Sequence, residues 1–136
     1  MRLDNAVSEI EALLKNSSEL SDAKIITAFP DAIKPTRLDK ALVAIGISEL
    51  DIAPSELESS NRAGNLSIFA DIFVPSSLGS TAPLNTLVSV CKALDAYCIV
   101  SIKADKPYYS REVQAVVLKT VITFSDRITF GGDDNE

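Results

Sequence analysis

Few side chains in this sequence are suited to catalysis. The chain of 136 residues has no histidine and two cysteines, Cys91 and Cys98. Histidine is the commonest general base and metal ligand, so its absence removes the usual catalytic triad. Cys91 could act as a nucleophile only beside another base, and its place on the apolar side of a predicted helix favours core packing. The spacing of the cysteines fits neither a CxxC site nor a disulfide framework, so we expect two buried free thiols.

The carboxylates do not form a predicted catalytic pair either. Glu56 and Glu58 fall in a polar stretch typical of a loop, and Asp133 and Asp134 fall in the C-terminal tail. A general acid or base must be held rigidly, which neither segment favours. The glycines match neither GxGxxG nor GxxxxGK followed by Ser or Thr, so no phosphate-binding loop is indicated. We therefore predict no catalytic residue, no cofactor and no metal site.

Several polar residues are better suited to contacts between subunits. Asp71 lies in the middle of a predicted strand, where it is either a solvent-facing charge or the partner of Arg111 or Lys119 in a neighbouring subunit. Tyr108, Tyr109 and Arg111 follow one another closely, and protein interfaces favour tyrosine and arginine. A turn with exposed aromatic residues explains the same cluster equally well.

The composition indicates one soluble domain. A chain of this length buries roughly two-thirds of its unfolded surface, which is enough for one core. Its 13 basic and 19 acidic residues give a net charge of −6 without any basic cluster, which argues against direct binding of nucleic acid. No apolar stretch is long enough to span a bilayer and the N-terminus does not read as a leader, so we expect a cytoplasmic protein where it is made.

The first half of the chain predicts one helix followed by two strands. In residues 3–14, apolar side chains recur at three- and four-residue steps, which is the pattern of a helix with one apolar stripe. Strands are predicted over residues 24–29 and 40–50, with Gly46 marking a bulge or a close backbone approach. Residues 54–65 are rich in loop formers and predict a long, polar, mobile hairpin tip.

The second half predicts a strand, a helix and two further strands. Side chains alternate along residues 66–74, so one face of this strand carries Leu66, Ile68, Ala70, Ile72 and Val74. Pro75 ends the strand because it lacks a donor. A helix follows with Thr81 or Ala82 as its cap and Pro83 in its first turn. Its single apolar stripe is predicted to contain Leu84, Leu87, Val88, Cys91 and Leu94.

The chain ends in a pair of strands and an acidic tail. Strands are predicted over residues 98–103 and 111–124, and the second is so long that a bulge divides it or its far end extends beyond the sheet. These elements predict an α/β (α+β) fold with a single mixed, mostly antiparallel sheet and two helices packed on one face. Residues 1–130 are expected to form one domain, and residues 131–136 a disordered acidic C-terminal tail.

The order of these elements resembles that of a known family. The residues that carry the resemblance are the strand Leu66–Val74 ending at Pro75, Gly79 with the helix from Pro83, and the run Arg111-Glu112-Val113-Gln114. Together they resemble the tail terminator proteins of long-tailed bacteriophages and of related phage-tail-like particles. The similarity is one of layout and covers nearly the whole chain.

The resemblance implies a homo-oligomeric ring, expected to have six subunits, at the head-proximal end of a virion tail. Such a ring caps the tail tube, stops its polymerisation and offers a surface to the head-side connector protein. DNA passes through the lumen without specific binding, which suits an acidic protein. We expect the subunit and partner contacts to involve Glu56, Glu58, Arg62, Asp71, Tyr108, Tyr109, Arg111, Ile128 and Phe130.

Three other functions stay open on the sequence. A different head–tail connector or tail completion subunit could have a similar small α/β body. A small enzyme that uses Cys91 with a carboxylate would need an accessible thiolate. The third is a protein-binding adaptor of a cell, with which the sequence is also compatible.

Overall fold

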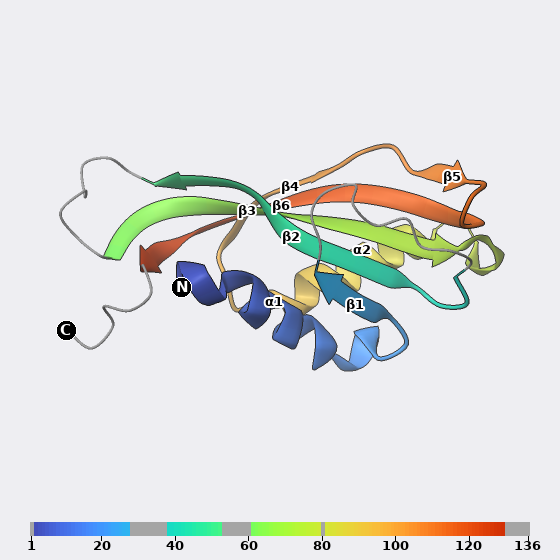
Figure 1. The fold of residues 1–136 in the computed structure, drawn as a ribbon, viewed down its shortest axis with the longest axis horizontal. Helices are drawn as coiled ribbons and strands as arrows, with labels where there is room; N and C mark the ends of the chain where they lie inside the picture. The colour runs from blue at the N-terminus through green and yellow to red at the C-terminus, as the bar shows by residue number, and fades with distance from the viewer. Residues whose placement is uncertain (1, 28–37, 53–60, 80, 130–136) are drawn as a thin grey trace.

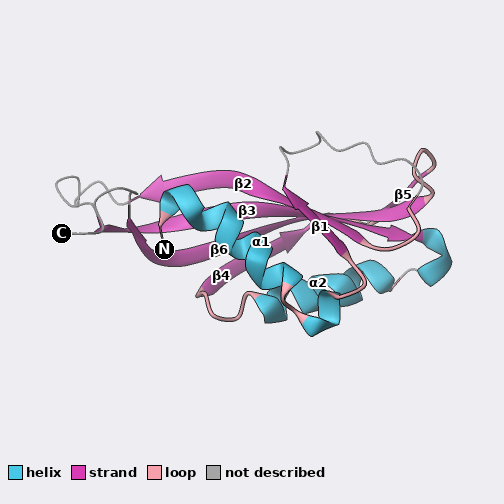
Figure 2. Cartoon of the chain, turned by 60° about the horizontal axis from the view of Figure 1, so that its bottom comes forward, coloured by secondary structure: helices cyan, strands magenta, loops and turns pink. Residues whose placement is uncertain are grey.

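The chain folds around one six-stranded sheet. The computed structural model describes residues 2–27, 38–52, 61–79 and 81–129. Along the sheet the strands follow the order β1-β2-β3-β6-β4, and β5 pairs with β6 beside β4. Strands β1 and β2 run parallel, whereas every other pair is antiparallel. The helices α1 and α2 both lie on one face of this sheet (Figure 1, Figure 2), which confirms the predicted fold class.

The strands differ strongly in length. The three strands at the edges, β1, β4 and β5, are short, and the three between them, β2, β3 and β6, are long. Their bounds are β1 Lys24–Thr27, β2 Leu42–Ile52, β3 Asn61–Pro75, β4 Ile99–Ala104, β5 Tyr108–Ser110 and β6 Ala115–Thr129. The helices are α1 Ala6–Lys15 and α2 Ala82–Ala93, with short 3-10 turns at Leu3–Asn5, Ser18–Leu20 and Ser76–Leu78. In the part of the chain that the structure describes, no helix is long and apolar enough to cross a membrane.

Helix α1 forms where the sequence predicts it. Its residues Ala6, Ile10 and Leu14 recur every four positions, and all three are fully buried against the sheet. The helix ends at Lys15, with Asn16 as its C-cap, and Lys15 Nζ pairs with Glu11 Oε2 one turn earlier at 3.2 Å. The predicted apolar stripe therefore matches the buried stripe in this helix.

Helix α2 forms where the sequence predicts it, and its predicted stripe is correct only in part. Pro83 lies in the first turn, yet the side chain of Thr81 makes no capping hydrogen bond. Leu94 of the predicted stripe is fully buried, and Leu87 and Cys91 pack partly buried against the core. Leu84 and Val88 were also expected to face the sheet and are exposed, whereas Val90, outside the predicted stripe, is fully buried. The helix carries apolar residues on two sides, so the 3.6-residue period alone does not reveal which side packs on the sheet.

The centre of the fold is the antiparallel pair of β3 and β6. It runs in unbroken register from Asn61 opposite Thr129 to Pro75 opposite Ala115. The predicted alternation along β3 is confirmed, since its helix-facing residues are all at most 1% exposed: Leu66, Ile68, Ala70, Ile72 and Val74. Leu118, Ile122 and Phe124 of β6 extend the same core beneath the two helices.

Several predicted boundaries were wrong. Strand β3 already begins at Asn61, so the end of the predicted 54–65 loop is strand. Strand β6 begins at Ala115 because residues 111–114 form a turn in which Gln114 has a φ of 52°. It then continues to Thr129 without a bulge in its pairing with β3. The only irregularity in the β2–β3 register within residues 42–52 and 61–75 lies between Ile47 and Glu49, whereas Gly46 sits in regular register with Phe69.

The face opposite the helices carries a second, smaller cluster. Leu42, Ala44, Phe73 and Val117 are buried there, with Ile26 and Leu38 packed against them. Predictions that concern residues 28–37, 53–60 and 130–136 lie outside the described residues. These include the contacts of Glu56, Glu58 and Phe130 and the acidic tail.

Candidate functional site

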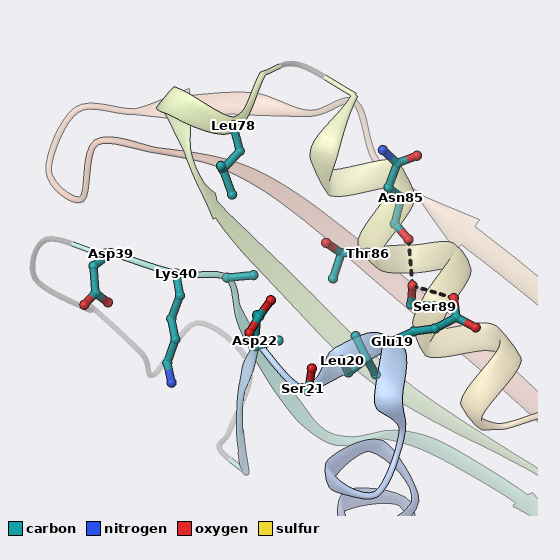
Figure 3. Close-up of a pocket in the computed structure, with 12 residues that line it drawn as sticks. Glu19, Leu20, Ser21, Asp22, Asp39, Lys40, Leu78, Asn85, Thr86 and Ser89 are labelled. Carbon is teal, nitrogen blue, oxygen red and sulfur yellow. Dashed lines mark hydrogen bonds between the residues drawn. The ribbon is translucent and has the colours of Figure 1, made fainter.

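One pocket opens between the turns that lead into the sheet and helix α2. Its volume is about 530 Å³, and both polar and apolar residues line it, as Figure 3 shows. Ser89 Oγ lies 3.2 Å from the carbonyl oxygen of Asn85 and 3.4 Å from Glu19 Oε1, and it can donate to either. Glu19 also faces Lys92 Nζ at 3.7 Å. These contacts tie the 3-10 turn Ser18–Leu20 to α2.

The pocket does not bring a nucleophile and a base together. Its twelve lining residues include serine, threonine and carboxylates but no cysteine or tyrosine. Ser89 already has a backbone carbonyl as an acceptor, and the nearest carboxylate is Glu19 at the edge of hydrogen-bond distance. Among residues 2–27, 38–52, 61–79 and 81–129, no three potential ligands gather in a way that could hold a metal ion. We therefore assign no reaction to this pocket.

The two cysteines have different surroundings. Cys91 on α2 is half-buried, and this burial raises the pKa of its thiol above the ordinary value of 9.0. A raised pKa keeps the thiol protonated at neutral pH, which disfavours a role as nucleophile. Cys98 was expected to be buried and is exposed, because it precedes the outermost strand β4. The prediction of two buried thiols is therefore wrong for Cys98.

A groove lies between helix α2 and strand β4. It has a volume of about 590 Å³, and most of its wall is apolar. The residues that line it are Leu87, Val88, Cys91, Lys92, Asp95, Ile99 and Ile102. Strand β4 is the last strand on this side of the sheet, so nothing among the described strands covers its outer edge. Val100 on the same strand is also exposed. An apolar groove beside a free strand edge is a surface suited to binding another protein.

Strand β5 continues the same edge of the sheet. Tyr108 and Tyr109 pair with Val117 and Val116 of β6, and about half of each tyrosine is exposed. Arg111 in the following turn is exposed as well. The three residues that the sequence singled out for an interface are therefore exposed at this edge, with Tyr108 and Tyr109 on opposite faces of β5.

The opposite edge of the sheet is only half covered. Strand β1 pairs with Leu42–Ile45 of β2 and leaves Gly46–Ile52 without a neighbour on that side among the described strands. This segment, the free half of β2, exposes the apolar side chains of Ile47 and Leu50. Both edges of the sheet thus present apolar surface to solvent.

Two of the remaining predicted contact residues, Asp71 and Ile128, are buried within the subunit. Asp71 is only 7% exposed, so its interpretation as a solvent-facing charge is wrong. It sits opposite Ala44 on one side and Lys119 on the other, so the partner considered in a neighbouring subunit is already beside it in its own chain. Ile128 is fully buried within the subunit, which leaves it no surface for a neighbour. Arg62 lies in β3 near the far end of the sheet.

Sequence reasoning missed the residues that expose most apolar surface at the two edges. These are Ile47 and Leu50 on β2, Leu84 and Val88 on α2, and Val100 and Ile102 on β4. One signal was available, since α2 has more apolar positions than one face of a helix can bury. The others depend on which strands are outermost, which the local pattern does not contain.

Comparison with known proteins gives little similarity. No protein family matches this sequence, and no curated protein matches it either. Among solved structures, the chain is similar to one from the "Virion of native gene transfer agent (GTA) particle". The two share 9% sequence identity with a TM-score of 0.39, over 87% of this chain and 84% of the other. This overlap is too weak to define a shared fold.

Proposed function

We propose that the chain is a non-enzymatic structural subunit of a phage or phage-like tail. It acts as a tail terminator: copies form a ring, with six subunits, that caps the tail tube and stops its polymerisation. The ring also presents the attachment surface for the head-side connector protein. Its place is the head-proximal end of the tail in the virion, and the host bacterial cytoplasm during assembly.

The observation that carries this proposal is the contrast between a filled core and unfilled edges. Helix α1 and the central strands β3 and β6 bury the apolar residues of the core, while both edges of the same sheet expose apolar side chains. Monomeric proteins rarely leave apolar surface at two strand edges, because free edges invite further pairing. Such a subunit is built to have neighbours on both sides, as in a ring.

The surface tyrosines and the overall charge fit the same role. Tyr108, Tyr109 and Arg111 are exposed in and just after β5 at one end of the sheet edge, which suits a contact with the tail tube or the connector. The net charge of −6 suits a lumen through which DNA moves without being held. The layout of the sequence, which resembles the tail terminator family, supports the same assignment.

The state of assembly tests this function directly. The purified chain should form rings of uniform subunit number, seen by light scattering after size-exclusion chromatography and by negative-stain electron microscopy. Rings should bind the end of preformed tubes of the tail-tube protein and stop their elongation. A chain that stays monomeric at all concentrations, with and without tubes, would contradict the proposal.

The tyrosine cluster offers a second readout. Replacing Tyr108 and Tyr109 together by serine should weaken binding of the chain to the tail tube or the connector by roughly thirtyfold or more. Tyrosines that become buried in an interface commonly dominate its binding energy. Tyr97→Phe is the matched control, since it changes a tyrosine that packs on Phe124 with ring centroids 5.4 Å apart inside the subunit. Equal behaviour of both variants would exclude the cluster from the interface.

A further inference from the structure

We infer that a second copy of this chain places the free half of its β2, Gly46–Ile52, against the groove between α2 and β4. The inference rests on the proposed function in one respect, since it names the surfaces by which ring subunits meet. It goes further in assigning both sides of the contact. The first side is the groove with the outer edge of β4, and the second is the uncovered edge of β2.

Both surfaces carry apolar side chains that the subunit leaves in water. On the groove side Val88 is 52% exposed and Ile102 is 45% exposed. On the β2 side Ile47 is 42% exposed and Leu50 is 37% exposed. Removing apolar surface from water favours association. Contact between the two surfaces would therefore remove exposed apolar side chains of both from water.

The two surfaces lie at the same height of the sheet. Ile102 pairs with Ile122, Ile122 with Ile68, and Ile68 with Ile47. Directly opposed residues of antiparallel strands point to the same face, and Ile68 and Ile122 lie in the core beneath the helices. Ile102 and Ile47 therefore both point to the helix-covered side. This is the side on which the groove opens.

The strand directions fit as well. Strand β2 is antiparallel to β3, β3 to β6, and β6 to β4, so β2 and β4 are antiparallel to each other. Two copies placed side by side with their helices on the same face therefore bring antiparallel edges together. Antiparallel edges are the arrangement that strand addition commonly uses.

The charges on the two strands are complementary. The free half of β2 carries Glu49 and Asp51, while Lys103 is the one charged residue of β4. Glu49 lies opposite Ser67 and Lys103 opposite Val121, which places both on the face away from the helices. The groove itself adds one charge of each sign, so Lys103 sets the balance on that side. Opposite charges favour this pairing over contacts between two identical edges.

The outlines of the two edges require a rotation or shift between copies. Through the paired residues Lys24, Leu42, Phe73 and Val117, strand β1 lies at the height of Tyr108 in β5. A flat alignment would bring β1 of one copy onto β5 of the next. A repeated rotation between copies that meet head to tail closes a ring, whereas a flat alignment would extend without limit.

Two single variants and their mixture test the inference. Ile102→Arg disables the groove side, and Leu50→Arg disables the β2 side. Each variant alone should associate at least roughly thirtyfold more weakly than the wild-type chain, as expected for a buried anchor residue. Mixed in equal amounts, the two variants share one intact interface and should form dimers that grow no further. Light scattering and native mass spectrometry measure these species.

The controls separate this inference from the proposed function. Leu78→Arg changes a side chain that is 59% exposed elsewhere and should leave assembly unchanged. Circular dichroism checks that all three variants fold. If both single variants still form rings like those of the wild-type chain, this inference is overturned and the ring proposal stays intact. A wild-type chain that never assembles would contradict both.

Discussion

Isoleucine residues that pair with one another are buried at the centre of the sheet and exposed at its edges. Ile122 on β6 and Ile102 on β4 are directly paired and point to the same face, yet Ile122 is fully buried and Ile102 is nearly half exposed. The helices cover the central strands, and the core of the subunit ends at β6 on this side. Apolar residues beyond that limit contribute little to the stability of a single subunit, and we assign them to contacts between copies.

The largest expected effect comes from this pair of isoleucines. Ile122→Ala should lower the free energy of unfolding by about 2–5 kcal/mol because it removes buried methyl groups and leaves a cavity. Ile102→Ala should lower it by less than about 1 kcal/mol, since much of that side chain is already in water. Urea denaturation of the monomeric protein measures both values. Similar losses in the two variants would mean that the edge belongs to the core.

A smaller effect is expected at the far end of the central strands. A Cβ at Gly64 would lie 2.7 Å from the backbone oxygen of Asp51 and 3.1 Å from Ile128 Cδ1. Gly64→Ala should therefore cost about 1–3 kcal/mol, because the strands must move apart. Gly79→Ala in the loop before α2 meets no atom within 4 Å and is disfavoured only by its φ of +94°. Adding Ile128→Val should partly restore the melting temperature of Gly64→Ala and leave that of Gly79→Ala unimproved.

Two side-chain hydrogen bonds of β6 differ in burial, and the more buried one should contribute more to stability. Thr120 Oγ1 donates to the carbonyl oxygen of Ala70 at 2.6 Å in a buried position. Thr120→Val should cost about 1 kcal/mol, since the shape is kept and the bond is lost. The hydroxyls of Thr123 and Ser67 lie 2.8 Å apart where water has partial access. Thr123→Val should cost about half as much in chemical denaturation, and the reverse order would contradict the assigned burial.

The smallest effect should appear at alkaline pH. Burial raises the pKa of the Cys91 thiol above 9.0, and burial with the nearby carboxylates Glu9 and Asp126 raises the pKa of Tyr97 above 10.0. The unfolded chain ionises these groups first, so their contribution to stability is complete below pH 9 and is lost as pH rises through the folded-state values. Cys91→Ala and Tyr97→Phe should each flatten the fall of melting temperature above pH 9. An unchanged slope in both would contradict these shifts.

The elements of the fold followed from local patterns, with clear exceptions. Alternation identified the helix-facing side of β3 because every second residue from Leu66 to Val74 is apolar and side chains alternate across a strand. The beginning of β6 was missed because the turn at Gln114 uses a positive φ without the glycine or asparagine that usually announces it. For Asp71 the sequence left open a solvent-facing charge or a partner in a neighbouring subunit, and its burial depends instead on neighbours from β2 and β6 of its own chain.

The candidate surface was predicted only where residue type was enough. Tyr108, Tyr109 and Arg111 stand out by composition, and the structure places them together on one edge. Ile47 and Ile102 look like ordinary core residues in the sequence. They become exposed only because β2 extends past the short β1 and β4 is outermost, and both facts follow from strand order rather than from local sequence.

The long ladder between β3 and β6 has a consequence for how the subunit folds. Its partners are joined by the whole segment between Pro75 and Ala115, which contains α2, β4 and β5. Closing this loop before any ladder bond forms costs on the order of 3 kcal/mol of chain entropy, and such non-local pairing slows folding. Until β6 has been synthesised and paired, β3 keeps one side open. Newly made chains should therefore pass through a slow step in which they are prone to aggregate. Pairing of β3 with β6 must be complete before copies of the chain associate.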